Sequence, residues 1–392
     1  MADSGLSTGK ETRFMQKHYL LTPGPTPVPE NVLLEMAKPI IHHRTPQFMA
    51  ILKEATDGLK YILQTKNDVF LFTSSGTGAM ESAVTNLLSR EDKAVVVRGG
   101  KFGERFSEIC QAYGVNAINL DVEWGNAVAP DRIEDLLAKD KAIKAVYVTL
   151  CETSTAVVND IKAIGEVVSK TPAVLVVDVI SGLGSVEFKT DEWNVDIAVG
   201  GSQKGLMIPP GLAFVSVSKK ALAVAETSKL PKFYFSYKAA KKASDKNDTP
   251  WTPAVTLVIG LVEAIKMIRQ ETIEGAIIRQ RKMAQAIRAA ALAIGLELYA
   301  PKAASDAVTA ISIPSNIDGS KLVKTMRDVY GVGIAGGQAE LKGRIIRIAS
   351  MGFMSQWDII VAISCLEMTL KQMGHDLVLG SGVKAAEEVF GG

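Results

Sequence analysis

An aspartate and a lysine follow two successive apolar runs of this sequence, at positions where side chains often do chemistry. Asp178 closes the run 173–178, and Lys204 stands in the glycine-flanked turn 200–205, directly after the next apolar run. Short apolar runs of this kind are typical of buried parallel strands. A lysine can form an imine with an aldehyde, and a carboxylate can keep a ring nitrogen protonated, so that the ring withdraws electrons. The pair indicates pyridoxal phosphate chemistry, with a surface lysine and an ordinary strand end as the alternative.

A second segment predicts a phosphate-binding helix N-terminus. Residues 68–73 form an apolar run, and the small polar residues 74–78 lead into a helix with apolar side chains on one face. The first N–H groups of a helix lack partners within it, and the helix dipole favours an anion beside them. The segment is not a dinucleotide fingerprint, because Glu81 stands where the third glycine would be. A Ser/Thr cap on a packing helix is the alternative.

An arginine lies within the apolar strand predicted at 344–350. Alternation places Arg347 on the face of Ile345 and Ala349. A buried guanidinium requires a partner, because an unpaired buried charge is costly. That partner is either a substrate carboxylate or the carboxylate of a structural salt bridge.

Together with several other motifs, these segments resemble a class V, fold type I pyridoxal-phosphate aminotransferase of the alanine–glyoxylate and serine–pyruvate branch. The resemblance runs from about Tyr19 to the end of the C-terminal domain. The motifs that carry it are 21–27, 75–81, 103–105, 152–155, Asp178, 202–204, 209–211, 252–253 and Arg347.

The resemblance implies a role for each predicted site residue. Lys204 would hold the cofactor and move the substrate proton, and Asp178 would pair with the ring nitrogen. Phe102 would stack on the ring. The remaining implied cofactor contacts are Ser75, Gly76, Thr77, Thr153, Gln203 and, from the neighbouring subunit, Thr252. Gly24 and Arg347 would bind the substrate.

The implied reaction moves the amino group of alanine or serine to glyoxylate or pyruvate, in a homodimer whose active sites lie at the interface. An aspartate or other class V aminotransferase, such as a phosphoserine-type enzyme, is the alternative. A cysteine desulfurase fits less well, because Gln203 stands where those enzymes typically have His, and Cys365 lies in an amphipathic helical run. A catalytically silent homologue is the third possibility, against which Lys204 and Asp178 argue.

Strand-like and helix-like segments alternate along the first two thirds of the chain. The strand candidates are 68–73, 94–98, 115–120, 144–150, 173–178, 196–200 and 212–217, with helices at 77–89, 103–113 and 131–138. This alternation predicts an α/β fold with a mostly parallel, doubly wound sheet, whose ligands collect at the carboxyl ends of the strands. Residues 230–250 are expected to form an exposed excursion, and one long helix is expected from 254 to 294.

The expected domains are an N-terminal arm (1–21), a large pyridoxal-phosphate-binding domain (22–290) and a smaller α+β domain (291–392). The strands expected in the last are 296–300, 307–313, 331–335 and 344–350, with helices at 319–329 and 355–373.

Composition excludes several other classes of protein. Lys and Arg number 44 against 42 Asp and Glu, and no basic stripe with interleaved aromatics supports nucleic-acid binding. No apolar stretch is long enough for a membrane span, and the opening residues 1–17 lack the apolar core of a signal peptide. The three cysteines show no Cys-x-x-Cys spacing, which argues against a metal site and suits a reducing cytoplasm.

Overall fold

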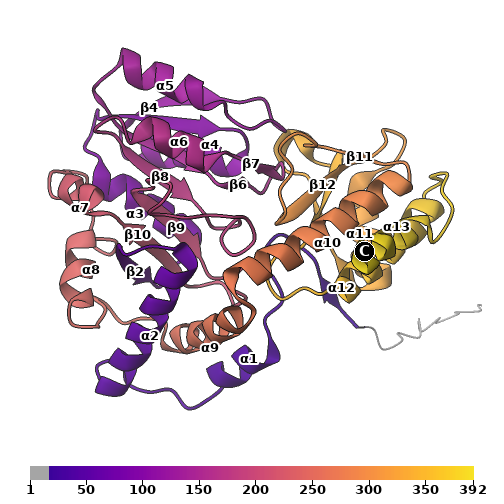
Figure 1. Cartoon of the computed structure of the whole chain (residues 1–392), viewed down its shortest axis with the longest axis horizontal. Helices are drawn as coiled ribbons and strands as arrows, with labels where there is room; N and C mark the ends of the chain where they lie inside the picture. Colours follow the sequence, from indigo (N-terminus) through magenta and orange to yellow (C-terminus); the bar gives the residue numbers. More distant parts are fainter. Residues whose placement is uncertain (1–16) are drawn as a thin grey trace, which may run out of the picture.

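A seven-stranded sheet forms the centre of the larger half of the molecule (Figure 1). The computed structural model describes residues 17–392, so most of the predicted arm 1–21 lies outside the described residues. In spatial order the strands are β2 (Asp68–Phe72), β10 (Ala213–Val217), β9 (Ile197–Gly201), β8 (Val174–Asp178), β5 (Ile143–Thr149), β3 (Lys93–Arg98) and β4 (Asn116–Asp121). Only β10 runs antiparallel to its two neighbours in this sheet. The predicted mostly parallel α/β sheet is confirmed.

Helices cover both faces of this sheet, as the doubly wound prediction requires. They are α1 (Glu30–Met36), α2 (Pro46–Leu63), α3 (Gly76–Leu87), α4 (Lys101–Ala112), α5 (Pro130–Lys139), α6 (Ile161–Val168), α7 (Lys219–Ala225), α8 (Tyr237–Ser244) and α9 (Val255–Glu271). One apolar core packs α2, α5, α6 and α9 on the sheet, and a second packs α3, α4, α7 and α8. Every residue of β8, β9 and β10 is buried. Burial on both faces explains why these strands read as continuous apolar runs.

Two expectations about the chain after β10 were wrong. Residues 230–250 are not wholly an exposed excursion, because they contain α8, where Tyr237 is fully buried and lies 3.1 Å from the Ser82 hydroxyl. The expected single helix 254–294 is two helices, because the backbone turns at Thr272, where φ is 68° and ψ is 159°. Apolar spacing continues across that turn, and this continuity concealed the break.

The smaller half contains a second sheet packed beside α10 (Ile273–Ala293) (Figure 1). Its order is β11 (Glu297–Leu298), β12 (Val308–Ser312), β15 (Ile345–Ala349) and β14 (Ala335–Gly336). The other elements here are α11 (Gly319–Tyr330), the 3-10 turn η1 (Ala339–Leu341), α12 (Gln356–Gln372) and α13 (Ser381–Gly391). The expected α+β arrangement is confirmed, whereas the exact boundary near residue 290 stays a prediction.

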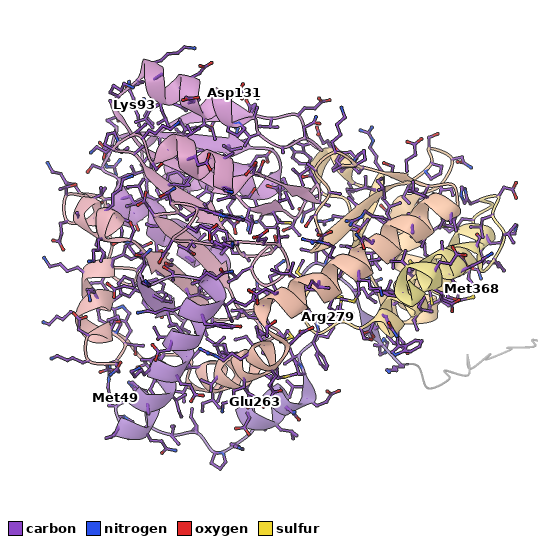
Figure 2. The ribbon with its side chains drawn as sticks, viewed as in Figure 1. Met49, Lys93, Asp131, Glu263, Arg279 and Met368 are labelled. Atoms are coloured by element: carbon purple, nitrogen blue, oxygen red, sulfur yellow. The ribbon has the colours of Figure 1, made fainter. Side chains whose placement is uncertain are left out.

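One short strand pair, one backbone hydrogen bond and one arginine connect the halves. The pair β1 (Tyr19–Leu20) and β13 (Val332–Gly333) is parallel. Within the larger half β6 (Cys151–Glu152) pairs with β7 (Val157–Val158), and the N–H of Val158 donates to the carbonyl of Ala303 at 2.9 Å. Arg279, labelled on α10 in Figure 2, donates to the carbonyl of Met354 at 2.8 Å and also pairs with Glu271. These contacts fix the segment before α12 against the start of α10.

No helix within residues 17–392 has both the length and the apolar composition that a membrane span requires.

Candidate active site

The predicted site residues converge where the parallel strands of the large sheet end. Asp178 is the last residue of β8, Lys204 follows β9, and Gly76 begins α3 directly after β2. A Cβ atom built on Gly201 would lie 3.5 Å from the backbone nitrogen of Gly76. The start of α3 and the turn that carries Lys204 are therefore neighbours, as the carboxyl edge of such a sheet favours.

Lys204 is buried beside the segment that follows β1. Its ammonium donates a hydrogen bond to the carbonyl of Pro23, and its own carbonyl accepts one from the Thr26 hydroxyl at 2.9 Å. At Gly24, where φ is +132°, a Cβ atom would collide with the lysine side chain. The position requires glycine for its backbone and for this close approach. Burial lowers the pKa of Lys204 to about 8, because the charged ammonium loses hydration.

Asp178 is buried beside Lys204. Its carboxylate accepts a hydrogen bond of 2.8 Å from the N–H of Ile180. Burial raises the pKa of Asp178 to about 7, against the opposing effect of that hydrogen bond and of the Lys204 charge. Burial therefore disfavours the charged forms of both central groups, the Lys204 amine and the Asp178 carboxyl.

The start of α3, at residues 75–77, has the properties of an anion-binding site, which we call the cup. Ser75 is its N-cap residue, but its side chain makes no capping hydrogen bond, so the helix start remains open. Gln203 is half-buried, and its side-chain oxygen is buried without a hydrogen-bond partner among residues 17–392. Arg105 brings a positive charge to this end, because its guanidinium donates to the Thr77 hydroxyl at 3.3 Å. A phosphate suits such a cup, since helix N–H groups, the dipole and a guanidinium all favour an anion.

Two further predicted residues lie on the side of β6 and α4. The Thr153 hydroxyl donates to the Ser181 hydroxyl at 2.6 Å. Phe102 lies in the first turn of α4, and the Arg105 guanidinium lies over its ring, 4.9 Å from the centroid. Arg105 thereby links the Phe102 ring to Thr77 of the cup.

Arg347 is buried in β15 and is held by carbonyl groups. Its Nη1 donates to the carbonyl of Thr153 at 2.8 Å, and its Nε and Nη2 donate to that of Gly336 at 3.0 and 2.8 Å. Burial lowers the pKa of Arg347 to about 10. Within residues 17–392 it has no salt-bridge partner, so the structural ion pair considered from the sequence is absent. The guanidinium is thus held by carbonyl groups and forms no salt bridge within these residues, while the charge of Glu152 partly opposes the effect of burial on its pKa.

Thr252 is the predicted residue that the described chain does not bring into this group. It is exposed in the loop before α9, and no hydrogen bond within residues 17–392 joins it to another predicted site residue. The loop does approach the start of α3, because the N–H of Ala254 donates to the Thr73 hydroxyl at 2.9 Å.

Two residues of the site were missed as contacts by the sequence reasoning. The sequence placed Arg105 in the motif 103–105, without its contacts to Phe102 and Thr77. Glu152 was noted only as part of a motif, yet it is 1% exposed and accepts hydrogen bonds from Phe102, Gly103 and Ser154. An acidic residue three positions after the buried strand β5 was the one signal that pointed to Glu152.

No group of three or more His, Cys, Asp or Glu side chains in the described part of the chain is arranged to hold a metal ion. Cys110, Cys151 and Cys365 are free and buried.

Comparison with known sequences gives a family and full-length relatives. Residues 18–354 match the family described as Aminotransferase class-V. The chain is 43% identical to a Synechococcus protein named soluble hydrogenase, small subunit, over 96% of this chain and 99% of that one. It is 39% identical to the L-aspartate–glyoxylate aminotransferase of Paracoccus denitrificans, over 95% and 96% of the two chains. It is 36% identical to the serine–glyoxylate aminotransferase of Methylorubrum extorquens, over 96% of each chain.

A solved structure has the same fold along its whole length. The ureidoglycine–glyoxylate aminotransferase of Bacillus subtilis superposes with a TM-score of 0.93 at 29% identity, covering 97% of this chain and 100% of that one.

Proposed function

The chain belongs to the class-V aminotransferases, and from this premise we propose that it is a pyridoxal-phosphate enzyme that moves the amino group of alanine or serine to glyoxylate or pyruvate. The observation that carries the proposal is the convergence of Lys204, Asp178 and the open start of α3 at one sheet edge. Three relatives named above act, by their names, with glyoxylate, and this supports a small 2-oxo acid as acceptor.

The residues at the site fit pyridoxal phosphate. This cofactor carries an aldehyde, a pyridine nitrogen and a phosphate. Lys204 offers the amine for the aldehyde, Asp178 the carboxylate for the protonated nitrogen, and the cup at 75–77 with Gln203 the donors for the phosphate. When bound, the cofactor supplies an electron-withdrawing ring that stabilises negative charge at the substrate Cα.

The roles that we propose for the protein groups follow from their charges. Lys204, with its pKa of about 8, is partly neutral near neutral pH, so it can take the Cα proton and return it at another carbon. Arg347 offers a buried guanidinium fork without an acidic partner, which suits the carboxylate of an amino acid. Gly24 leaves the space beside Lys204, and Thr153 and Phe102 hold the ring.

We also propose a homodimer in which Thr252 reaches the cofactor of the partner. Its support is the exposure of Thr252 beside Trp251, whose ring stacks on that of Phe233 from the loop before α8, and Phe233 is itself 76% exposed. Free thiols at all three cysteines support a reducing cytoplasm as the place of action.

An aspartate donor is the main alternative, and the Paracoccus relative supports it by name. A phosphoserine-type reaction needs an anion site beyond Arg347, for which Arg44 and Arg105 are the candidates. Of these, Arg44 is paired with Asp248. A cysteine desulfurase has the least support, because burial raises the pKa of the Cys110, Cys151 and Cys365 thiols, which opposes thiolate formation.

Amino-group donation can be followed in single half-reactions. The purified enzyme with its cofactor is mixed with alanine, serine, aspartate, phosphoserine or cysteine, and the visible absorbance is recorded. We expect alanine or serine to convert the cofactor to its amine form and glyoxylate to restore it. Conversion by aspartate or phosphoserine alone would replace the small-donor proposal, and sulfide release from cysteine alone would overturn transamination.

The cofactor attachment is tested separately by borohydride reduction and peptide mapping. We expect the label on Lys204 and none on the Lys204→Ala variant. A label on another lysine would contradict the proposed site without touching the donor result.

A further inference from the structure

The start of α4 carries two residues of the site but has no cap of its own. Phe102 lies in its first turn and Arg105 directly follows that turn, and Gly100, the residue before the helix, has no side chain with which to cap it. The first N–H groups of a helix need partners from outside, and a buried helix start without them is strongly disfavoured. The partners for α4 come from a segment about fifty residues further along the chain.

Glu152 and Ser154 supply these partners. The Ser154 hydroxyl accepts from the N–H of Lys101 at 3.0 Å. The Glu152 carboxylate accepts from the N–H of Phe102 at 3.1 Å and from that of Gly103 at 3.0 Å. The same Ser154 hydroxyl donates to Glu152 at 2.5 Å, so the two side chains act as one unit. Three successive donors of the helix are satisfied by this unit.

Gly100 makes room for the arrangement. A Cβ atom at this position would lie 2.5 Å from Cγ and Cδ of Glu152. The absence of a side chain at the helix start is thus the condition for capping by a distant carboxylate. A negative charge at a helix N-terminus is also favoured by the dipole. Burial raises the pKa of Glu152, and its hydrogen bonds from Ser154, Gly103 and Phe102 oppose that effect.

We propose that Glu152, together with Ser154, is a positioning residue that caps α4 from the β6 turn and thereby holds the Phe102 ring where the cofactor binds. Arg105 extends the effect, because it lies over the Phe102 ring and donates to Thr77 at the phosphate cup. The inference rests on the proposed function in one respect, namely that Phe102 faces the cofactor.

The same turn also reaches the substrate end of the site. Thr153, between the two capping residues, gives its carbonyl to the Arg347 guanidinium at 2.8 Å. A displacement of the turn that carries Glu152 would therefore move the Phe102 ring and the Arg347 guanidinium together.

The test compares Glu152→Gln with wild type in two measurements. In cofactor-free protein, hydrogen exchange of a peptide spanning 99–106 reports the cap directly, and we expect about tenfold faster exchange, because the amide presents only one acceptor oxygen to these donors. In the loaded enzyme, the rate of cofactor loss on dilution should rise about tenfold and the absorbance maximum should shift.

The control is Asp160→Ala, which removes the side-chain cap of α6, where Asp160 accepts from the N–H of Ala163 at 3.0 Å. It should accelerate exchange in α6 and leave cofactor loss at the wild-type rate. Ser154→Ala is the second variant, because it keeps the Glu152 charge and should give smaller changes of the same sign even if Glu152→Gln folds poorly.

Each outcome decides a separate point. Unchanged exchange at 99–106 would show that Glu152 does not cap the helix. If exchange is faster but cofactor loss and the absorbance maximum stay at their wild-type values, Glu152 caps the helix without positioning the Phe102 ring. If the wild-type protein takes up no pyridoxal phosphate, the proposed function fails, while the exchange measurement still decides whether the cap exists.

Discussion

At the scale of single residues, burial sets the chemistry of the two central groups. It shifts the pKa of Lys204 down to about 8 and that of Asp178 up to about 7, from ordinary values of 10.5 and 3.8. Both shifts favour the neutral form, because a buried charge loses its hydration. A lysine that is partly neutral can act as nucleophile and base, and a carboxyl in this state gains from a cationic partner.

Substitution of Asp178 by Asn should impair turnover far more than folding. The amide has nearly the same shape but cannot supply the charge that holds a proton on the ring nitrogen. Preorganised charges of this kind are worth about 10²- to 10³-fold in rate, so we expect a loss of at least that size. Steady-state turnover measures the loss, and the thermal midpoint of the cofactor-free protein is the control. Near wild-type turnover with cofactor bound would refute this role for Asp178.

Covalent capture of the cofactor by Lys204 should depend on pH in a definite way. Only the neutral amine reacts, and lowering the pKa to about 8 raises its fraction at pH 7 to roughly one tenth, against about 0.03% for an ordinary lysine. The capture rate by cofactor-free protein should rise with pH up to about 8 and then level off. The same measurement on Nα-acetyl-lysine, whose side-chain amine has an ordinary pKa, corrects for the titration of the cofactor. A rise that continues to pH 10 would contradict the lowered pKa.

At the scale of elements, the junction between α9 and α10 depends on one strained residue. Thr272 adopts φ 68° and ψ 159°, a region that is essentially restricted to glycine. Its hydroxyl also caps α10, accepting from the N–H of Gly275 at 3.0 Å. The residue thus carries a conformational cost and a capping gain at once.

Two substitutions at Thr272 separate these effects. Thr272→Ala loses the cap and keeps the strain, so it should destabilise the protein by about 1 kcal/mol. Thr272→Gly loses the cap but relieves the strain, and we expect it to be more stable than the alanine variant by roughly 1 kcal/mol. Thermal unfolding of the two variants and wild type provides the comparison. An alanine variant as stable as the glycine variant would argue against strain at this position.

At the scale of the whole molecule, the exposed aromatic surface beside Thr252 is the candidate dimer interface. Phe233 is stacked on Trp251, with ring centroids 4.6 Å apart. The loop that carries Trp251 continues through Thr252 to α9. A large exposed aromatic cluster is typical of interaction surfaces. If the partner covers it, the cofactor sites and the assembly depend on each other.

Phe233→Glu should therefore weaken both assembly and cofactor retention. A glutamate buried in the interface would lose its hydration in each subunit, and this cost opposes association. Light scattering over a dilution series should show monomers for this variant and dimers for wild type, with faster loss of cofactor from the monomers. Val378→Glu is the matched control. Val378 is 77% exposed, as much as Phe233 at 76%, but it lies away from this surface, shortly before the start of α13. Dimers that persist in Phe233→Glu would remove this surface from the interface.

The sequence determined the residues that local pattern alone can identify. Asp178 and Lys204 follow apolar runs, and the small polar turn before α3 has the composition of an open helix start. Continuous apolar runs likewise determined the central strands of the α/β sheet, because β8, β9 and β10 are buried on both faces.

Tertiary structure decided the contacts between segments distant in the chain. The partners of Arg347 are carbonyls of Thr153 and Gly336, and the cap of α4 comes from Glu152. Neither pairing follows a period in the sequence, since each arises only when separate strands and loops meet. The break at Thr272 was hidden for a related reason: both helices bury apolar faces, so their spacing continues while the backbone turns. Local pattern thus identifies the groups that can react, and packing decides how those groups are held.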